Sequence, residues 1–202
     1  MQNINKALLH LKKDKSLVKV IKQFPKPSLE LGSNYFGALS ESIIYQQLSG
    51  KAAGTIERRF KALFKGKMTP KKVLNLKDIQ FKGVGISGQK MKYLRDLSIK
   101  FLDGTVNPSG FGKMTDEDIR QHLISVKGIG RWTADMFLIF TLNRPDVLPT
   151  GDLGIQKGFK KVFNLKKLPD AQKMQKLAKI WKPYCTIASL YLWKVADKEK
   201  EN

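Results

Sequence analysis

The sequence predicts an all-α fold of about ten helices, and three observations support this prediction. Apolar residues recur at helical spacing along almost the whole chain. No run of alternating apolar and polar residues bounded by turn residues indicates a strand. The hydrophobic fraction of 42%, with 11 Phe and 3 Trp in 202 residues, is typical of a globular protein. The chain shows neither an internal repeat nor a low-complexity linker.

The predicted helices follow one another closely. Apolar periodicity places them near residues 4–11, 17–24, 36–44, 49–64, 69–76, 87–97, 115–124, 130–142, 152–163, 170–181 and 184–196. Several of them begin at residues that can cap a helix: Ser33 or Asn34, Ser49, Thr69 before Pro70, Ser87, and a capping box at Thr115–Asp118. Pro25 and Pro27 stop the second helix.

The charge of the chain indicates a polyanionic partner. There are 38 Lys and Arg residues against 17 Asp and Glu residues, which gives a net charge of +21. Nucleic acid is the first candidate for such an excess, and an acidic membrane surface is the second. The charges are scattered along helices that also have core faces, which places the membrane last. A Lys-rich surface that only keeps the protein dissolved is the simplest alternative.

Several classes of protein are excluded by the residues that the chain lacks. A single cysteine, Cys185, excludes an internal disulfide and a multi-cysteine zinc or iron–sulfur site. His10 and His122 stand far apart, so a zinc enzyme is not expected. With no charged-then-apolar leader and no apolar run of ~18 residues, we expect an intracellular, soluble protein with no membrane partner.

A Gly-x-Gly turn between two predicted helices is a candidate phosphate site. Gly128 and Gly130 can both take positive φ and leave backbone N–H groups uncovered, and Ile129 between them can point into the core. These amides and the N-terminus of the helix that starts near Arg131 favour an anion such as a DNA phosphate. Taken alone, the same pattern is more often only a tight turn between helices.

Asp152 can be read in two compatible ways. An Asp that opens a helix is usually an N-cap that accepts backbone N–H bonds. A cap bond and the helix dipole would also keep the carboxylate charged and aimed. A fixed carboxylate of this kind suits a reaction that passes through a sugar cation.

Four separated segments carry a resemblance to a known family. Val126–Ala134 (VKGIGRWTA) and Leu148–Ile155 (LPTGDLGI) resemble the helix-hairpin-helix-GPD superfamily of DNA glycosylases. Tyr45–Ala53 (YQQLSGKAA) and Trp181–Tyr184 (WKPY) are similar to its alkyl-base branch, the DNA-3-methyladenine glycosylase II group.

The resemblance implies one glycosylase domain over residues 1–202 with two lobes. A helical lobe would span about 34–147, and residues 1–33 and 148–196 would form the other. The active site, with Asp152, would lie in the cleft between them.

The resemblance also implies an activity on damaged double-stranded DNA. The lesion base would be flipped out of the duplex, Asp152 would stabilise the oxocarbenium ion, and water would cut the N-glycosidic bond. Trp132 stands where strand-nicking relatives commonly have a lysine nucleophile, so a monofunctional enzyme without lyase activity is expected. Its substrates would be alkylated purines, chiefly 3-methyladenine and 7-methylguanine, in base-excision repair.

Two alternatives to this activity stay open. The chain could be a glycosylase for another lesion, such as a deaminated or etheno base. It could also be a non-catalytic helix-hairpin-helix DNA-binding protein. We expect a monomer, in the cytoplasm or nucleoid of a prokaryote or the nucleus of a eukaryote.

Site residues follow from the same resemblance. The base pocket would be formed by Trp132, Met136 and Tyr184, whereas Trp181 and Trp193 would pack in the core. DNA contacts would come from Gln46, Gln47, Leu48, Ser49, Lys51, Gly85, Ser87, Lys127, Gly128, Gly130, Arg131 and Thr133. A Leu or Gln of the 46–49 turn would fill the gap left by the flipped base, and the sequence does not single out which. No cofactor is required, although backbone carbonyls of Ile124, Val126 and Ile129 match positions that bind Na⁺ or K⁺ in relatives.

Three departures from the family bear on substrate range. Cys185 stands where many relatives have Arg, and Met136 replaces an aromatic residue found in some members. We also expect no N-terminal β domain of the kind that some relatives carry. These differences affect the lining of the pocket more than the fold.

Overall fold

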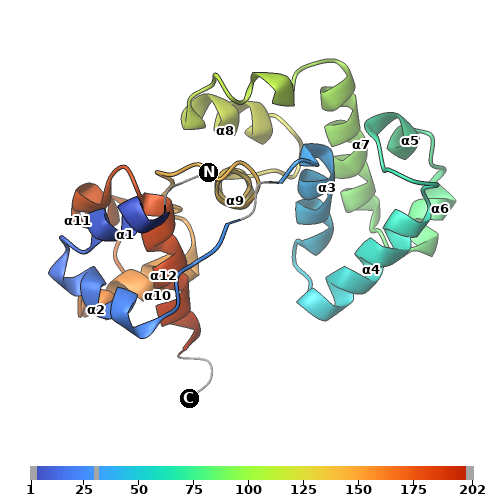
Figure 1. The fold of residues 1–202 in the computed structure, drawn as a ribbon. Coiled ribbons are helices and arrows are strands. Elements are labelled where there is room, and N and C mark those ends of the chain that lie inside the picture. The colour runs from blue at the N-terminus through green and yellow to red at the C-terminus, as the bar shows by residue number, and fades with distance from the viewer. Residues whose placement is uncertain (1–3, 30–31, 199–202) are drawn as a thin grey trace. The chain divides into compact units, whose positions relative to one another are not determined.

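A computed structural model of the chain describes residues 4–29 and 32–198, and the regular secondary structure within them is all helical (Figure 1). The all-α prediction is confirmed. The described helices are α1 (Ile4–Leu11), α2 (Lys15–Gln23), α3 (Tyr35–Tyr45), α4 (Gly50–Ala62), α5 (Pro70–Leu74), α6 (Asp78–Gly83), α7 (Gly88–Leu102), α8 (Asp116–Ile124), α9 (Arg131–Phe140), α10 (Leu153–Val162), α11 (Ala171–Ala178) and α12 (Cys185–Asp197), with 3₁₀ turns η1 (Pro108–Gly110) and η2 (Lys179–Trp181).

Local capping explains where many of these helices begin. The predicted caps at Asn34, Ser49, Thr69, Ser87 and Thr115 all accept a backbone N–H from the first turn of their helix. The capping box at the start of α8 is also present, with Asp118 reaching back to the N–H of Thr115. None of the described helices is long and apolar enough to cross a membrane.

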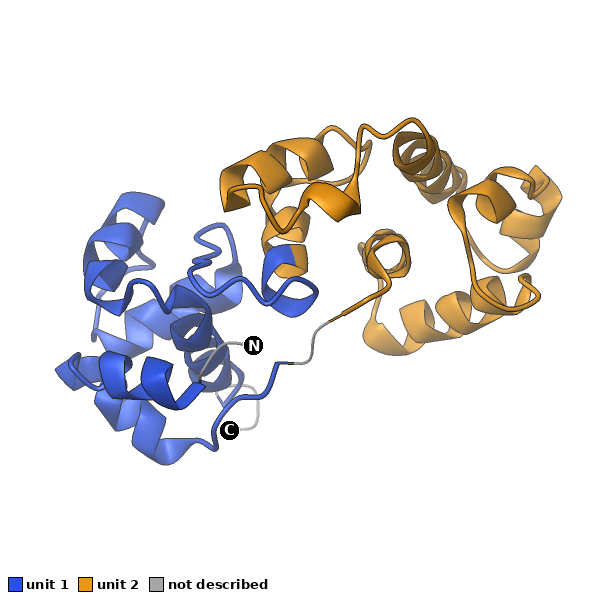
Figure 2. Cartoon of the chain, turned by 45° about the horizontal axis from the view of Figure 1, so that its top comes forward, with its two compact units in different colours: residues 1–31, 138–202 blue, residues 32–137 orange. Residues whose placement is uncertain are grey.

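The chain divides into two compact units (Figure 2). Unit 1 combines both ends of the chain, Met1–Leu31 and Leu138–Asn202, and unit 2 is the continuous segment Gly32–Phe137. The boundary between Phe137 and Leu138, where the chain returns to unit 1, therefore lies about ten residues before the predicted boundary near 147. The reason is that residues 144–147 bond to α12: the Thr186 amide donates to the Pro145 carbonyl, and the Val147 amide donates to the Thr186 hydroxyl, both at 3.0 Å.

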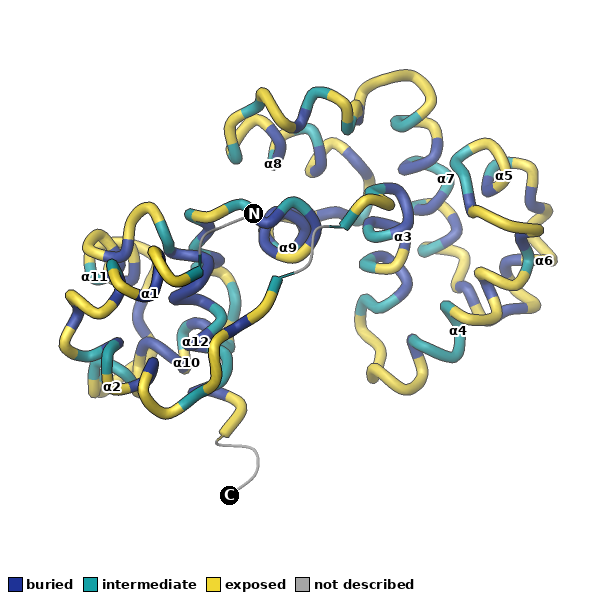
Figure 3. The backbone as a smooth tube through the Cα atoms, viewed as in Figure 1, coloured by how far each residue is buried: buried dark blue, intermediate teal, exposed yellow. Residues whose placement is uncertain are grey.

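Unit 2 is built around α3 and α7. α3 packs against α4 and α7, and α5 and α6 lie along α7. Aromatic rings fill the space between α4 and α6, where Phe60 contacts Phe64 edge-on and lies 5.7 Å from Phe81. α4 itself buries only Ala53 and Phe60, and Figure 3 shows much of its remaining surface exposed.

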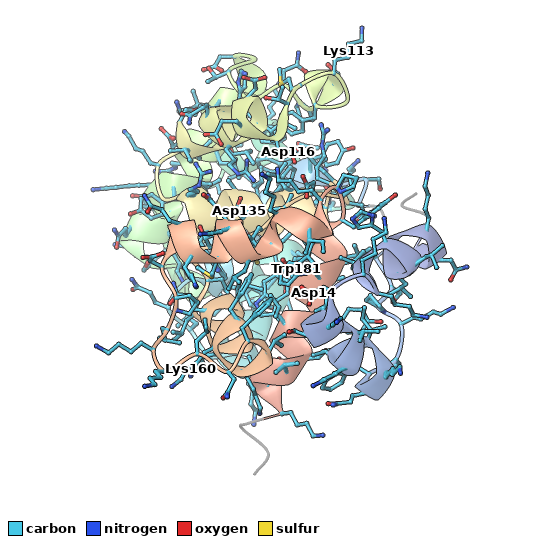
Figure 4. The ribbon with its side chains drawn as sticks, turned by 90° about the vertical axis from the view of Figure 1, so that its left-hand side faces the viewer. Asp14, Lys113, Asp116, Asp135, Lys160 and Trp181 are labelled. Atoms are coloured by element: carbon cyan, nitrogen blue, oxygen red, sulfur yellow. The ribbon has the colours of Figure 1, made fainter. Side chains whose placement is uncertain are left out.

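Unit 1 is built around α12, which packs against α10 and, less extensively, against α1 and α2. Figure 3 shows α12 buried along most of its length. Trp181 is fully buried, as predicted, and stacks on Phe159 of α10 at 5.1 Å. Its indole N–H donates to Asp14, the buried N-cap of α2, at 2.8 Å, and Figure 4 shows the two side chains next to each other. Residues at opposite ends of the chain thus share one core.

Candidate active site and DNA-binding turns

Asp152 is held at the start of α10 by its own turn. Its side chain Oδ1 accepts the amide of Ile155 at 2.8 Å, which makes it the N-cap that the sequence predicts. Its own amide donates to the Pro149 carbonyl at 3.0 Å, so the Pro-Thr-Gly turn fixes the backbone that carries it. The side chain is half-buried. The carboxylate therefore has a defined direction and retains access to solvent.

A tryptophan from α12 holds the same carboxylate oxygen. The Trp193 indole Nε1–H donates to Oδ1 of Asp152 at 2.8 Å, and this contact joins residues 41 apart in the sequence. Trp193 packs against the core, as predicted, yet it is only partly buried. Gly154 makes room for the ring, since a Cβ at this position would lie 2.8 Å from its Cδ1 and 3.0 Å from Asp152 Oδ1. No local sequence pattern indicates the hydrogen bond between Trp193 and Asp152.

An aromatic surface continues from this tryptophan. Phe140 stacks on Trp193 with ring centroids 5.7 Å apart and is itself 48% exposed. The two rings, with Leu190, Lys194 and residues 26–28, line a hollow of about 480 Å³ within unit 1. Trp193 therefore bonds to the Asp152 carboxylate and also lines an open, largely apolar hollow of unit 1.

The residues predicted to form the base pocket are divided between the two units. Trp132, which is 51% exposed, and Met136, which is half-buried, lie on the part of α9 that belongs to unit 2. Tyr184 belongs to unit 1, where it is half-buried and contacts His10 edge-on at 5.3 Å. The grouping of these three side chains into one pocket stays a prediction.

Cys185, which replaces an arginine of many relatives, lies in the core of unit 1. It is 2% exposed, its amide donates to Asp146 at 3.3 Å, and burial raises the pKa of its thiol well above the usual range. The residue therefore contributes packing and carries no charge toward the site.

Three of the predicted DNA-binding turns meet within unit 2: the turn between α3 and α4, the turn between α6 and α7, and the hairpin between α8 and α9. The Gln46 side chain donates to the Gly128 carbonyl at 2.7 Å, which joins the first turn to the hairpin. A hollow of about 150 Å³ lies among them, lined by Gln46, Gln47, Ser87, Gln89, Lys90, Tyr93 and Gly128. Segments separated by up to 82 residues in the sequence thus form one polar surface.

The hairpin has the predicted inward anchor and one of the two predicted positive φ angles. Val126 and Ile129 are 1% and 3% exposed and fix the turn to the core. Gly128 has φ +84°, and a Cβ there would lie 2.2 Å from the Tyr93 ring. Gly130 does not take positive φ, because its carbonyl already accepts the Ala134 amide as the first bond of α9. It leaves the following amides uncovered simply by having no side chain.

The cation proposed for this hairpin would be held by backbone oxygens. Ile124 is 37% exposed at the end of α8, and the Val126 carbonyl accepts the Ile129 amide at 3.0 Å. In residues 4–29 and 32–198, no group of three His, Cys, Asp or Glu side chains could hold a metal ion. Binding of Na⁺ or K⁺ by the carbonyls of Ile124, Val126 and Ile129 stays a prediction.

The remaining predicted DNA contacts differ in exposure. Leu48 is 39% exposed, and Gln47, Ser49, Lys51, Gly85 and Ser87 are exposed on the turns. The Lys127 side chain is 74% exposed, and its Nζ lies 3.9 Å from Asp96 Oδ1. Arg131 pairs with Glu117 at 3.2 Å. Thr133, in the first turn of α9, is only 6% exposed, and its contact with DNA stays a prediction.

Below Arg131, a buried ion pair joins the two helices of the hairpin motif. Arg120 Nε of α8 donates to Asp135 Oδ1 of α9 at 2.7 Å, with side-chain exposures of 11% and 6%. Burial raises the pKa of Asp135, and the Arg120 guanidinium opposes this rise. Glu117 accepts hydrogen bonds from Gln121 and Arg131, which lower its pKa. No sequence motif indicates this network, because its members come from two helices.

Comparison with known proteins agrees with this arrangement. Residues 41–183 match the family described as HhH-GPD superfamily base excision DNA repair protein. The chain is 32% identical to DNA-3-methyladenine glycosylase 1 of Schizosaccharomyces pombe over 202 residues, covering 96% of this chain and 88% of the relative. It is 34% identical to DNA-3-methyladenine glycosylase of Saccharomyces cerevisiae over 220 residues, covering 98% and 72%.

Solved structures give the same result. The 3-methyladenine DNA glycosylase of S. pombe in complex with abasic DNA matches with a TM-score of 0.83 and 31% identity, covering 95% of this chain and 97% of that one. A DNA-3-methyladenine glycosidase of Bacillus halodurans matches with a TM-score of 0.88 and 32% identity, covering 100% and 92%. The chain belongs to the HhH-GPD superfamily of base excision DNA repair proteins, in the branch of the alkyl-base glycosylases.

Proposed function

We propose that this protein is a monofunctional DNA glycosylase that hydrolyses the N-glycosidic bond of alkylated purines, chiefly 3-methyladenine and 7-methylguanine, in damaged duplex DNA. The observation that carries the proposal is the Asp152 carboxylate, whose Oδ1 accepts both the Ile155 amide and the Trp193 indole N–H at 2.8 Å. A DNA-binding module without chemistry has no need for a carboxylate fixed in this way. The relatives named above are DNA-3-methyladenine glycosylases, which favours alkylated purines over other lesions.

The chemistry places modest demands on the protein. The damaged nucleotide leaves the stack, at a cost of a few kcal/mol that is lowest for a damaged or mismatched base. The bond between C1′ and the glycosidic nitrogen breaks, and both electrons go to the base, whose positive charge is thereby neutralised. Asp152 stabilises the oxocarbenium ion left on the sugar, water adds to C1′, and its proton is released. An exposed aromatic ring such as Trp132 suits stacking on a cationic base.

The absence of strand cleavage follows from one position. A lyase would need an amine to form a Schiff base with C1′, and Trp132 occupies the place where strand-nicking relatives commonly have that lysine. Water is then the nucleophile, and the product is an intact strand with an abasic site. Such a function places the protein with the cell's DNA.

The test is release of free bases from methylated duplex DNA, with adenine and guanine adducts resolved by chromatography and strand nicking followed in parallel. Asp152→Asn keeps a good helix cap but removes the negative charge, so we expect a loss of about 10²–10³ in the rate of release. Asp170→Asn is the matched control, because Asp170 caps α11 through the Lys173 amide at 2.7 Å. It should release bases at the wild-type rate.

Each outcome has a clear meaning. Release by wild type without nicking, and its loss in Asp152→Asn alone, supports the proposal. Wild type that binds the DNA but releases no alkylated base contradicts it. Duplexes with deaminated or etheno bases would then separate a glycosylase for another lesion from a non-catalytic binding protein.

A further inference from the structure

The Lys90 side chain links two of the turns that are predicted to bind DNA. It lies in the first turn of α7, and its Nζ donates to the carbonyls of Ile44 and Gln46 at 2.7 and 2.8 Å. These carbonyls lie at the C-terminal end of α3, where backbone acceptors have no partner within the helix and where a cation is favoured. Partial burial lowers the pKa of Lys90, as expected for an ammonium group in part withdrawn from water. This lysine is therefore engaged with the protein backbone rather than extended into solvent.

The bond to Gln46 is one half of a double anchor. The backbone carbonyl of Gln46 accepts from Lys90, and its side chain donates to the Gly128 carbonyl at 2.7 Å. Gly128 in turn lies directly against the Tyr93 ring of α7. Gln46 is thus fixed on one side by α7 and on the other by the hairpin.

The residues after this anchor project outward. Gln47 is exposed and has φ +57°, a left-handed conformation that is uncommon for a residue other than glycine. Leu48 follows it and is 39% exposed. A non-glycine residue stays in such a conformation only when its surroundings fix it, and the anchor at Gln46 provides the fixed point on its N-terminal side.

We propose that Lys90 is a positioning residue that holds the Gln46–Ser49 turn ready to enter the duplex when a base leaves the stack. This inference rests on the proposed function, because it assigns Lys90 a part in how the same enzyme recognises damaged DNA. A turn that is already rigid loses less conformational freedom on insertion, so more of its contact energy can offset the cost of flipping. Lys90 acts through Gln46 and does not itself touch the reacting atoms.

The test compares binding and chemistry in matched variants. Lys90→Met keeps the length and apolar stem of the side chain but removes the donors, and Lys90→Arg restores the charge and the N–H groups. Lys92→Met is the control, because Lys92 is exposed on the same helix. The dissociation constants for an abasic-site duplex and for an undamaged duplex are measured by anisotropy. Single-turnover base release is followed with saturating enzyme, and thermal melting reports on the fold.

We expect Lys90→Met to raise the dissociation constant for the abasic duplex at least tenfold. A small displacement of the Gln46–Ser49 turn from its productive position can weaken its contacts by that much or more. Its affinity for undamaged duplex should change by less than about twofold, because the phosphate-binding hairpin is intact. Lys90→Arg should recover part of the loss, and Lys92→Met should match wild type. A merely structural role would lower the melting temperature and both affinities together.

The dissociation constants can be measured without turnover, so they test the role of Lys90 independently of the proposed activity. If wild type prefers the abasic duplex but releases no base, the proposed activity fails and the positioning role is still decided by the affinities. If Lys90→Met keeps the wild-type preference within about twofold, or if wild type has no preference to lose, the inference is overturned. Should Lys90→Met not fold, Lys90→Gln removes the charge and shortens the same side chain, and unchanged preference in that variant also overturns the inference.

Discussion

Replacing Trp193 with phenylalanine tests how the candidate catalytic carboxylate is held. The substitution removes the indole N–H that donates to Asp152 Oδ1 at 2.8 Å and keeps an aromatic ring beside Phe140. Asp152 remains the cap of α10 through the Ile155 amide. The carboxylate therefore stays in place and loses one of the bonds that set its direction.

The size of the effect follows from the bond that is lost. A hydrogen bond to a charged group contributes ~1.5–3 kcal/mol, and the partial exposure of both residues favours the lower end. A loss of ~1.4 kcal/mol in transition-state stabilisation corresponds to about tenfold in rate. We expect the single-turnover rate of base release to fall by about tenfold, with the affinity for undamaged duplex unchanged.

Two further variants separate the hydrogen bond from ring packing. Phe140→Leu removes the stacking partner of Trp193 and leaves the indole bond, so it should release bases at close to the wild-type rate. Gly154→Ala should reproduce the defect, because its Cβ would lie 2.8 Å from Trp193 Cδ1 and displace the ring. A role of the Trp193 indole bond in base release is contradicted if Trp193→Phe releases bases as fast as wild type, or if Phe140→Leu is slower than Trp193→Phe.

Further predictions concern the stability of the fold, DNA binding and the reactivity of the buried thiol. Asp135→Ala should lower the free energy of unfolding in urea by ~3 kcal/mol, because the buried Arg120 guanidinium loses its buried carboxylate partner and keeps the half-exposed Glu117; a change below ~1 kcal/mol would contradict this prediction. Gly128→Ala should weaken duplex binding and lower the melting temperature, because its Cβ meets the Tyr93 ring at a positive φ; normal binding would show that the hairpin can rearrange. Lys127→Gln should reduce the slope of log affinity against log salt concentration by about 1 if its ammonium group meets a phosphate, and an unchanged slope would remove it from the contact surface. Burial raises the pKa of Cys185, so Ellman's reagent should label it only as the protein unfolds, and rapid labelling of native protein would count against the packing described here.

Helix positions could be predicted from the sequence wherever the signal is local. Ser49, Ser87 and Thr115 each accept an amide N–H three residues further on, so the start of each helix can be recognised from adjacent residues. α6 was missed because it has six residues, buries only Phe81, and begins after Lys77 rather than after a typical capping residue. Short helices of this kind depend on their neighbours and leave little periodicity to detect.

The site could be predicted only in part, for a related reason. Asp152 stands out because its role as a cap can be read from the adjacent residues. Trp193 and Lys90 make their hydrogen bonds to residues 41 to 46 positions away. A single sequence carries no signal for contacts between residues so far apart. The exposure of a single residue is equally a property of the packed helix, which explains why the burial of Thr133 was not anticipated.

The arrangement of the two units in the sequence has a consequence for biosynthesis. Unit 1 needs both ends of the chain: Asp14 and Trp181, 167 residues apart, share a buried hydrogen bond. At about 5–20 residues per second, the ribosome delivers the second partner roughly 10–30 s after the first. Unit 2 is one continuous segment, so the turns predicted to bind DNA are all synthesised within that interval. A nascent or prematurely terminated chain would therefore carry the turns predicted to bind DNA before it possessed the carboxylate proposed to assist hydrolysis of the N-glycosidic bond.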